Sequence, residues 1–586
     1  MAAVTGNGHC GTALSLAPLG WLLYDRVMRH RPHQPHWEER DRLVLSNGHA
    51  AAMLYGCLYF SGYDLSLAEL KRFRLLNSRT PGHPETWMTP GIDMSTGPLG
   101  QGFAAAVGMA AAARHLGREN FTYVICSDGD MMEGVTSEAA SLASHLGLGN
   151  LIVFWDDNRM TIDGPLDESS CEDTYARFEA LGWDVQREID GERFDLLEEA
   201  VDRAKVSSKP SLIGVRTIIG YPAPNLQNTK EAHCPAFPPD EIRATKQELG
   251  LPPEDKFYVP EGMQPSPTTQ EPAAPEKSLP EINFPDFPVG ESLATRVSSG
   301  KILELLHQNL PNLLGGSADL AGSTRTLCGQ VRFGVREHAM ASFVLGATAY
   351  GGVLSYGATY FAFYDYMKPA IRLAALMNQP TIYLFSHDSI GLGADGPTHQ
   401  PVEQLASLRA TPNTVELRPC DAREVAGCWR YLLRRDRGPA ALILSRQELT
   451  TLAETDPLAV EKGAYIVRDG EAPKVTLVAT GSEVHLALEA SEFLEEQGVV
   501  VRVVSMPSMT LFSQQSPEYQ ENVLGSCPRL GIEAASPLGW HRWCQDTVCL
   551  DSFGLTGPGP GVMKLKGFTA ENVVRRALRL VSQSEA

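Results

Sequence analysis

The sequence lacks the patterns that mark several classes of protein. Its 11 cysteines are scattered, odd in number and contain no Cys-x-x-Cys pair, so no disulfide framework is expected and a reducing compartment such as the cytoplasm fits. Basic residues are also few, with 50 Lys and Arg against 70 Asp and Glu, which gives a formal net charge of −20. This negative balance argues against nucleic acid or an anionic membrane as a partner.

Long hydrophobic runs are missing as well. Ala13 to Tyr24 is the only apolar stretch that looks like a targeting signal. No basic segment precedes it, it has no small-residue cleavage site, and it is too short to cross a bilayer. We therefore expect a core helix there and no membrane partner.

What the sequence does contain, from residue 1 to about 250, is an alternation of apolar strands and helical stretches. The predicted strands are Tyr123–Cys126, Leu151–Trp155 and Ser211–Ile219, and the predicted helices are Phe103–Leu116, Glu138–Leu146 and Leu196–Ala204. Such alternation predicts an α/β domain with a parallel sheet covered by helices.

Two further blocks follow a segment rich in proline. Residues 251–290 are rich in Pro, Glu, Ser and Thr, which predicts a linker that buries little and is extended or mobile. Residues 291–455 and 456–586 again carry strand-like runs, at Thr381–Phe385, Ala440–Leu444, Val475–Ala479 and Val500–Val504. At 586 residues, the chain is long enough for three α/β domains.

Two oxygen-bearing side chains follow neighbouring predicted strands. Asp128 comes just after the run Tyr123–Cys126, and Asn158, thirty positions later, comes after Leu151–Trp155. In a parallel sheet, ligands gather beyond the carboxyl ends of the strands. Hard oxygen ligands suit Mg²⁺, which completes its octahedron with water and phosphates. The pair predicts a metal site that holds a diphosphate; the alternative is that both residues merely cap helices or turns.

The same pattern resembles the thiamine diphosphate motif, a Gly-Asp-Gly that leads to an Asn, with Ser127 in place of the first Gly. Longer motifs resemble those of transketolases. They are Ser-Asn-Gly-His at 46–49, Thr-Pro-Gly-His-Pro-Glu at 80–85, Thr-Gly-Pro-Leu-Gly-Gln-Gly at 96–102, Gly-Val-Arg-Glu-His at 334–338 and His-Asp-Ser-Ile-Gly-Leu-Gly-Ala-Asp-Gly-Pro-Thr-His-Gln at 387–400. The resemblance runs in order from about His9 to near the C-terminus.

The resemblance implies an architecture and a reaction. Two thiamine-diphosphate-binding parallel-sheet domains would precede a smaller C-terminal α/β domain, in a homodimer with its active sites at the subunit interface. The enzyme would transfer a two-carbon ketol unit from a ketose phosphate to an aldose phosphate through a dihydroxyethyl adduct of thiamine diphosphate, as in the pentose phosphate pathway. The metal would be Mg²⁺, or Ca²⁺ or Mn²⁺.

The resemblance also implies the residues that hold the cofactor. The metal ligands would be Asp128, Asn158 and the main-chain carbonyl of Met160. The other cofactor contacts would be His49, Gly97, Pro98, Leu99, Gly129, His233, Glu337, Tyr360, Phe363 and Tyr366, with Glu337 activating the cofactor. A glycine-rich turn before a helix favours phosphate on physical grounds. Tyr360, Phe363 and Tyr366, spaced by three, suit an aromatic box, although a core stripe of a helix has the same spacing.

Histidine suits proton movement near neutral pH. The resemblance makes six histidines catalytic together with Glu337, namely His9, His49, His83, His233, His387 and His399. The expected substrate contacts are His9, His83, His233, His387 and His399 with Arg74, Arg296, Ser323, Asp395 and Arg446. Asp395 would read an acceptor hydroxyl, and Arg296 and Arg446 would grip the phosphate.

Several departures from the family keep alternatives open. Cys10 stands where Pro is usual and Lys230 where His is usual. Only eight residues precede His9, so a usual N-terminal helix is expected to be missing, and the stretch between Ser323 and Arg336 is short. The alternatives are a dihydroxyacetone synthase, a relative acting on unphosphorylated sugars in secondary metabolism, and a degenerate, non-catalytic paralogue. The retained phosphate contacts argue against the first two, and Glu337, Asp128 and Asn158 argue against the third.

Overall fold

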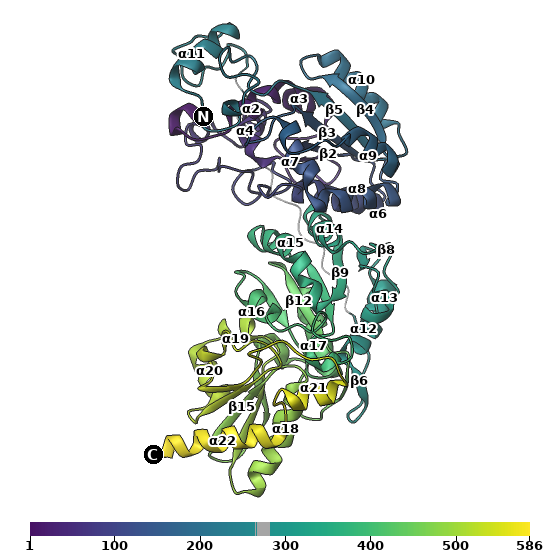
Figure 1. Ribbon diagram of the computed structural model, residues 1–586, viewed down its shortest axis with the longest axis vertical. Helices are drawn as coiled ribbons and strands as arrows, with labels where there is room; N and C mark the ends of the chain where they lie inside the picture. Colours follow the sequence, from purple (N-terminus) through teal and green to yellow (C-terminus); the bar gives the residue numbers. More distant parts are fainter. Residues whose placement is uncertain (264, 266–281, 586) are drawn as a thin grey trace. The chain divides into compact units, whose positions relative to one another are not determined.

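The computed structural model describes residues 1–263, 265 and 282–585. The chain divides into two compact units, which are described one at a time (Figure 1). The first unit comprises residues 1–277 and 342–353, and the second comprises residues 278–341 and 354–586. The division therefore falls inside helix α14 (Glu337–Tyr350).

The first unit is built on a five-stranded sheet in the order β1-β2-β3-β5-β4. Its strands are β1 (Arg42–Leu45), β2 (Thr122–Ser127), β3 (Leu151–Asp157), β4 (Asp184–Asp190) and β5 (Ser211–Arg216). All neighbouring pairs are parallel, which confirms the predicted class. Ser127 pairs with Asp156 at the end of the β2–β3 register. The segments after β2 and β3 therefore leave the sheet at the same edge.

Helices pack against this sheet, as the apolar spacing predicts. The longer helices of the unit are α4 (Ala51–Phe60), α6 (Gln101–His115), α8 (Gly134–Leu146), α9 (Thr174–Leu181), α10 (Phe194–Lys205) and α11 (Pro239–Glu248), and the shorter ones are α1 (Ala2–Thr5), α5 (Leu67–Leu70) and α7 (Asp128–Met132). Residues 101–113 of α6 are all buried. A helix buried on every side needs small side chains, and its alanines and glycines provide them.

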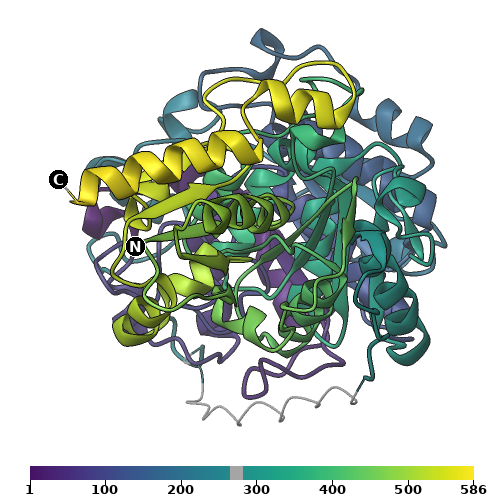
Figure 2. The same ribbon diagram turned by 90° about the horizontal axis from the view of Figure 1, so that it is seen from below.

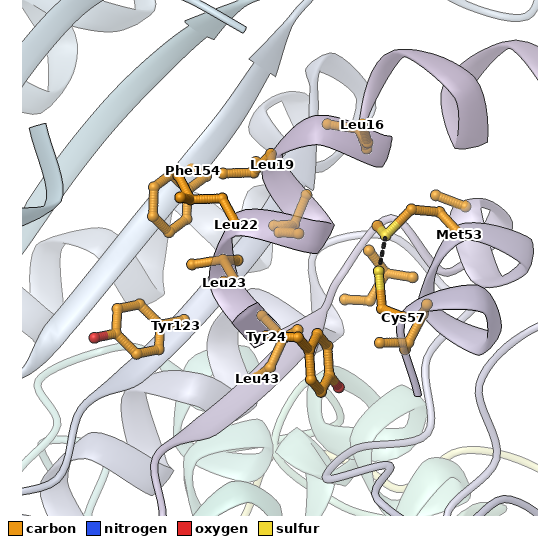
Figure 3. Close-up of a cluster of buried hydrophobic side chains, with 14 of the residues drawn as sticks. Leu16, Leu19, Leu22, Leu23, Tyr24, Leu43, Met53, Cys57, Tyr123 and Phe154 are labelled. Carbon is orange, nitrogen blue, oxygen red and sulfur yellow. Dashed lines mark hydrogen bonds between the residues drawn. The ribbon is translucent and has the colours of Figure 1, made fainter. Parts of the chain in front are cut away.

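The predicted core helix at Ala13–Tyr24 is present but broken into pieces. It comprises α2 (Cys10–Ser15), α3 (Ala17–Leu22) and a π-helical turn, η1 (Leu23–Val27). Pro18 lies in the first turn of α3, where its missing N–H is tolerated and a new helix begins readily. Figure 3 shows Leu19 and Leu22 directed toward Phe154 of β3, within one cluster of buried side chains.

The second unit contains a six-stranded parallel sheet in the order β11-β12-β10-β9-β7-β8. Its strands are β7 (Leu313–Ser317), β8 (Val331–Arg332), β9 (Leu354–Tyr360), β10 (Ile382–Ser386), β11 (Val415–Leu417) and β12 (Ala440–Leu444). The helices of this part are α12 (Thr295–Asn309), α13 (Ala321–Thr324), α15 (Tyr364–Leu376), α16 (Gln404–Arg409) and α17 (Ala422–Arg434). A short antiparallel pair, β6 (Ser292–Ala294) with β13 (Glu448–Thr450), accompanies them.

The same unit carries a second sheet, called the C-terminal sheet here, in the order β14-β16-β15-β17-β18. Its strands are β14 (Tyr465–Arg468), β15 (Val475–Ala479), β16 (Val501–Ser505), β17 (Arg529–Ile532) and β18 (Asp546–Val548), and only β14 runs antiparallel. Its helices are α18 (Glu483–Glu496), α19 (Met509–Ser513), α20 (Pro517–Leu524), α21 (Gly559–Leu565) and α22 (Ala570–Glu585). Helix α22, yellow in Figures 1 and 2, packs beside α18.

The proline-rich segment is only partly described. Pro267, Pro272 and Pro275 lie outside the described residues. Residues 251–263 and 282–290 form no helix or strand. Both of these stretches nevertheless pack, because Phe257 contacts the core of the first unit and Phe287 is buried in the second. The predicted boundaries at 250, 290 and 455 remain predictions.

None of the described helices has the length and apolar character needed to cross a membrane.

Candidate active site

The predicted metal ligands lie at the shared edge of β2 and β3. Asp128, the first residue of α7, is 3% exposed, and Trp155 Nε1 donates to its Oδ1 at 3.0 Å. The other carboxylate oxygen, Oδ2, is buried and has no hydrogen-bond partner among the described residues. Asn158 is also buried; its side-chain amide donates to Asp156 Oδ2 at 2.8 Å, and its Oδ1 accepts from the Met160 N–H at 2.9 Å.

The electrostatics of this edge suit a cation. The pKa of Asp128 is raised to about 8, mainly by burial and also by the nearby carboxylates of Asp156 and Asp157. A buried carboxylate beside two others is stabilised in its charged form by a cation. The orphaned Oδ2 oxygen, the amide oxygen of Asn158 and the carbonyl of Met160 are hard donors of the kind that Mg²⁺ takes. The residues present therefore fit a divalent metal.

In the described parts of the chain, no group of three or more His, Cys, Asp or Glu side chains is placed to hold a metal ion. The ligand set at Asp128 is of a different kind, because it combines a single carboxylate with an amide and a main-chain carbonyl.

The glycine-rich turn before α6 is held by Asp130. This carboxylate is fully buried and accepts hydrogen bonds from Ser46 Oγ at 2.5 Å, Gly100 N–H at 2.7 Å and Ser127 N–H at 2.9 Å. Ser127 also caps α7 in a reciprocal capping box with Asp130. Gly100 caps α6 at a φ of 75°, a left-handed conformation that glycine adopts without strain. Three separate segments thus converge on one side chain.

The predicted cofactor residues of the same turn directly precede Gly100 and Asp130, which are hydrogen-bonded to each other. Gly97 has a φ of 146°, and a side chain built on it would contact the ring of His83. Gly129 faces Leu99 so closely that an added Cβ would lie 2.7 Å from Leu99 Cδ1. Pro98, which lies between Gly97 and Leu99, is exposed. The two glycines therefore leave the backbone near the start of α6 without side chains, as a phosphate approaching that helix end requires.

Three of the predicted histidines form a cluster in the first unit. The rings of His9, His49 and His233 lie 5.0–5.4 Å apart, centroid to centroid. His9 Nδ1 lies 3.1 Å from the main-chain oxygen of His233. Burial lowers the pKa of His233 to about 4, with a further contribution from His9, and it lowers that of His49 well below its ordinary value. Neutral rings are therefore favoured throughout the cluster.

His83 and Arg74 flank this histidine cluster. Burial lowers the pKa of His83, and the charge of Arg74 lowers it further. Arg74 donates to the carbonyl of Gly82 at 3.3 Å and has a left-handed φ of 61°. Lys230, where the family usually has His, is exposed in a short 3₁₀ turn three residues before His233. Before His9 the structure describes one short helix, α1, of 4 residues.

In the second unit, Glu337 begins α14 and is 7% exposed. Thr359 Oγ1 donates to its Oε1 at 3.1 Å. The three predicted aromatics come from different elements: Tyr360 ends β9, Phe363 lies in a 3₁₀ turn (Phe361–Phe363) and Tyr366 lies in α15. Their rings stack in sequence, at 6.0 Å from Tyr360 to Phe363 and 5.8 Å from Phe363 to Tyr366. The alternative of a single helix stripe is therefore wrong.

His387 is the centre of the predicted substrate residues in this unit. It follows β10, is 2% exposed, has a left-handed φ of 63°, and its ring lies 3.7 Å from that of Tyr360. Burial lowers its pKa to about 3, and the positive charges of Arg296 and Arg446 and the nearby His399 add to the shift. Histidine and arginines are thus gathered where an anion would be attracted.

Three of the remaining predicted substrate residues, Arg296, Arg446 and His399, lie near His387. Arg296 Nη1 donates to the carbonyl of Ser323 at 2.7 Å. Arg446 is exposed just beyond the end of β12, as expected from its position after a strand. The His399 ring packs edge-on at 5.5 Å against Phe363, and Asp395 is exposed on the same loop.

Sequence reasoning missed the side chains that support these groups. Asp130 carried a signal, the Ser-x-x-Asp capping pattern at 127–130. Asp156, which accepts from the Asn158 amide and from Thr217 Oγ1, had none, because Thr217 directly follows β5, which neighbours β3 only in the folded sheet.

Comparison with known proteins decides the family. Three family models match in order: the transketolase thiamine diphosphate binding domain over residues 2–278, the transketolase pyrimidine binding domain over 291–451, and the transketolase-like C-terminal domain over 463–569. The chain belongs to the transketolase family. Its activity is therefore that of a transferase of the transketolase type, and its first domain is a thiamine diphosphate binding domain.

Individual transketolases agree along the whole chain. The transketolase of Geobacillus stearothermophilus is 43% identical over 643 aligned residues, covering 98% of this chain and 96% of the relative. The crystal structure of the Campylobacter jejuni transketolase superposes with a TM-score of 0.92 at 39% identity, covering 99% of this chain and 97% of the other. A Pichia stipitis transketolase in complex with sedoheptulose-7-phosphate gives 0.93 at 36% identity, covering 100% and 96%. The resemblance and the three-domain fold predicted from the sequence are confirmed.

Proposed function

We propose that this transketolase transfers a two-carbon ketol unit from a ketose phosphate to an aldose phosphate. Sugar phosphate substrates are supported by structures of Pichia stipitis transketolase and its mutants with sedoheptulose-7-phosphate, xylulose-5-phosphate and fructose-6-phosphate. The observation that carries the proposal for this chain is the gathering of Arg296, Arg446 and His399 around the buried ring of His387. That arrangement suits a substrate that is both anionic and rich in hydroxyls.

We propose that Mg²⁺ is held by Asp128, Asn158 and the carbonyl of Met160, and that it binds the diphosphate of the cofactor together with Gly97–Leu99 and Gly129. The support is the unpaired Oδ2 of Asp128 and its raised pKa. Ca²⁺ or Mn²⁺ has the same oxygen chemistry and suits the same donors. When bound, thiamine diphosphate supplies a carbanion centre and an electron sink.

The protein side of the reaction is proton movement and orientation. Glu337 would share a proton with a pyrimidine nitrogen of the cofactor, and the rings of Tyr360 and Phe363 would bind the pyrimidine. His9, His49, His83 and His233 would accept and return protons at the hydroxyls of the donor and at its carbonyl oxygen. Their lowered pKa values support this role, because a neutral imidazole is a proton acceptor at neutral pH.

On the acceptor side, we propose that His387 and His399 orient the aldehyde and that Asp395 binds its 2-hydroxyl. Arg296 and Arg446, with the Ser323 segment, would bind the terminal phosphate. Arg74 would add a contact from the first unit. Arginine suits this role because its fork can make two parallel hydrogen bonds to a phosphate.

A homodimer belongs to the same proposal. The diphosphate and metal residues all lie in the first unit, and Glu337 and the aromatic stack lie in the second. We propose that the first unit of one subunit and the second unit of its partner serve one cofactor. Cytoplasmic location is proposed from the cysteines, all 11 of which are free thiols in the structure.

The test is a substrate panel. Purified protein with thiamine diphosphate and Mg²⁺ would be given ketose phosphates as donors and, as acceptors, aldose phosphates, glycolaldehyde or formaldehyde. Products from aldose phosphates, formed with the highest kcat/KM, are expected. A preference for formaldehyde would instead indicate a dihydroxyacetone synthase, a preference for unphosphorylated sugars would indicate a specialised relative, and no turnover with tight cofactor binding would indicate a degenerate paralogue.

A further inference from the structure

The segment from His387 to Gln400 follows β10 and contains Asp395 and His399; it is called the substrate loop here. We propose that the C-terminal sheet sets the position of this loop through the buried guanidinium of Arg418, so that Arg418 and Glu483 are positioning residues for substrate selection. The inference rests on the proposed function in one respect only, which is that the substrate loop contacts the acceptor.

Arg418 joins the substrate loop to the C-terminal sheet with its whole guanidinium group. Its Nε and Nη2 donate to Asp388 Oδ2 at 3.0 and 2.7 Å. Its Nη1 donates to the carbonyl and the hydroxyl of Thr480, at 3.0 and 2.8 Å, and to the carboxylate of Glu483. Thr480 follows β15 and Glu483 begins α18. One side chain therefore spans both parts.

The contacts of Arg418 with Asp388 and Glu483 are buried. The Arg418 side chain is 1% exposed, and its partners Asp388 and Glu483 are 2% and 0% exposed. A buried ion pair is stable only when its geometry is good and its remaining polar atoms are bonded. Replacing Glu483 leaves Arg418 paired with Asp388 but removes a charged acceptor from its buried Nη1, which favours a shift of the guanidinium and of the backbone bonded to it.

The network around Glu483 is tied further into the C-terminal sheet. Glu483 accepts from the Ala534 N–H at 2.9 Å, just beyond β17. Thr480 Oγ1 also donates to Glu533 at 2.8 Å, and Glu533 accepts two hydrogen bonds from Arg409, both at 2.7 Å. The bond from Ala534 holds the Glu483 carboxylate, and the bonds at Glu533 hold the Thr480 hydroxyl, so both groups that accept from Arg418 Nη1 are themselves fixed.

Asp388 transmits the position of Arg418 to His387 through a single peptide bond. His387 has a left-handed backbone and a ring packed 3.7 Å from Tyr360. A change at Asp388 would alter the backbone of His387, and with it the direction of the imidazole. Arg418 would thus affect the substrate without contacting it.

The other end of the substrate loop has its own link to the C-terminal part. Gln400 Nε2 donates to the carbonyl of Gly393 within the loop and to that of Leu555, each at 3.0 Å. Gly393 lies so close to residues 557–559 that an added Cβ would be 2.7 Å from the Gly559 nitrogen. The first end of the loop is therefore held by Arg418, which is itself bonded to Thr480 and Glu483, and the other end is bonded directly to Leu555.

The experiment compares two variants of the same interface in the cofactor-loaded enzyme. Glu483→Gln keeps the shape of the side chain but removes the charge that pairs with Arg418. Tyr465→Phe is the matched control, because the Tyr465 hydroxyl bonds Glu424 at 2.7 Å and the Asp456 N–H at 3.3 Å, and neither of these partners belongs to the substrate loop. Both variants are expected to melt at lower temperature, and thermal unfolding would be measured for both.

Only Glu483→Gln is expected to change the kinetics of the acceptor. A displacement of the loop by about 1 Å should lower kcat/KM for an aldose phosphate by about ten- to a hundredfold, mostly through KM. Affinity for thiamine diphosphate, measured by calorimetry, should stay within about twofold for both variants, since the metal and diphosphate residues are untouched. Arg418→Lys should retain more activity than Arg418→Met, because it keeps the charge but not the fork.

Three results would bear on the inference separately. Equal kinetic effects of Glu483→Gln and Tyr465→Phe would overturn it, since the interface would then be merely structural. If Glu483→Gln does not fold, Gln400→Ala tests the other link, and unchanged acceptor kinetics there would overturn the inference too. Asp395→Ala is the reference for the proposed function: if it leaves acceptor kinetics unchanged, the loop does not bind the acceptor, whereas a change in Asp395→Ala alone removes only the positioning role.

Discussion

His9 Nδ1 lies 3.1 Å from the main-chain oxygen of His233, although 224 positions separate the two residues. A carbonyl oxygen only accepts hydrogen bonds, so we assign the proton of the neutral His9 ring to Nδ1, which leaves Nε2 as an acceptor. Burial and Arg74 lower the pKa of His9 and favour this neutral form. The contact therefore fixes both the tautomer and the orientation of the ring.

The first prediction concerns acid stability. His233 has a pKa of about 4 in the folded protein, and about 6.5 is expected when it is unfolded. Between these values the unfolded chain binds more protons, so the free energy of unfolding falls as the pH falls through this window. His233→Asn removes this contribution and should lose less stability on acidification. Thermal unfolding at about pH 7 and about pH 5 measures it, and equal losses in both proteins would contradict the assignment.

The second prediction concerns the metal. Asp128→Ala should abolish both Mg²⁺ binding and metal-dependent binding of thiamine diphosphate, because the diphosphate would meet no compensating charge. Asp163→Ala, an exposed carboxylate in the loop after Met160, is the control and should bind normally. Calorimetry of cofactor binding with Mg²⁺ and with excess chelator provides the measurement. Unchanged affinity in Asp128→Ala would remove the metal assignment.

The third prediction concerns the support of Asn158. Thr217 Oγ1 bonds Asp156, which in turn accepts from the Asn158 amide. Thr217→Val should weaken Mg²⁺ affinity by about ten- to a hundredfold, as is typical when a partner of a metal ligand is lost. Thr122→Val is the control, since Thr122 Oγ1 is buried without a partner among the described residues. The idea fails if both valine variants bind the metal equally well in a titration.

The fourth prediction separates cofactor binding from activation. Glu337→Gln keeps the size of the side chain and a hydrogen-bonding group, including the contact from Thr359, but cannot share a proton in the same way. Cofactor affinity should be nearly unchanged, while exchange of the thiazolium proton slows by orders of magnitude. NMR of deuterium exchange measures the rate, and exchange at the wild-type rate would show that Glu337 is not the activator.

The fifth prediction concerns the phosphate of the substrate. Arg446→Ala should raise KM for phosphorylated sugars about ten- to a hundredfold, since a charge-assisted contact contributes roughly 1.5–3 kcal/mol. Glycolaldehyde, which has no phosphate, should be barely affected. Arg437→Ala is the control, because Arg437 is an exposed arginine that precedes the first residue of β12, whereas Arg446 follows the last. Steady-state kinetics with both acceptors decide the matter, and equal losses on both would make Arg446 structural.

The sequence allowed the strands and the groups at their ends to be predicted, because burial on both faces leaves continuous apolar runs. The runs before Asp128 and Asn158 are β2 and β3, and they are adjacent and parallel as expected. The same reasoning places His387 and Arg446 after β10 and β12. Their roles in catalysis remain predictions.

The partners of these groups could not be predicted from the sequence. Thr217 reaches Asp156 only because β5 lies next to β3, an order that the apolar pattern does not specify. Arg418 gave no signal either, since an arginine after a short strand is usually at the surface, and its burial depends on two carboxylates from distant segments. Tertiary pairing, rather than local propensity, decides such contacts.

The convergence of Ser46, Gly100 and Ser127 on Asp130 has a consequence for the thermodynamics of cofactor binding. The turn that approaches a phosphate is already held in place by a buried carboxylate. A ligand that binds there loses little affinity to the ordering of flexible chain, because that entropy was lost when the protein folded. A substitution of Asp130 that frees the turn should therefore make the entropy of cofactor binding less favourable while few contacts to the cofactor are lost. A van't Hoff series of binding constants would separate this signature from the loss of a group that contacts the cofactor.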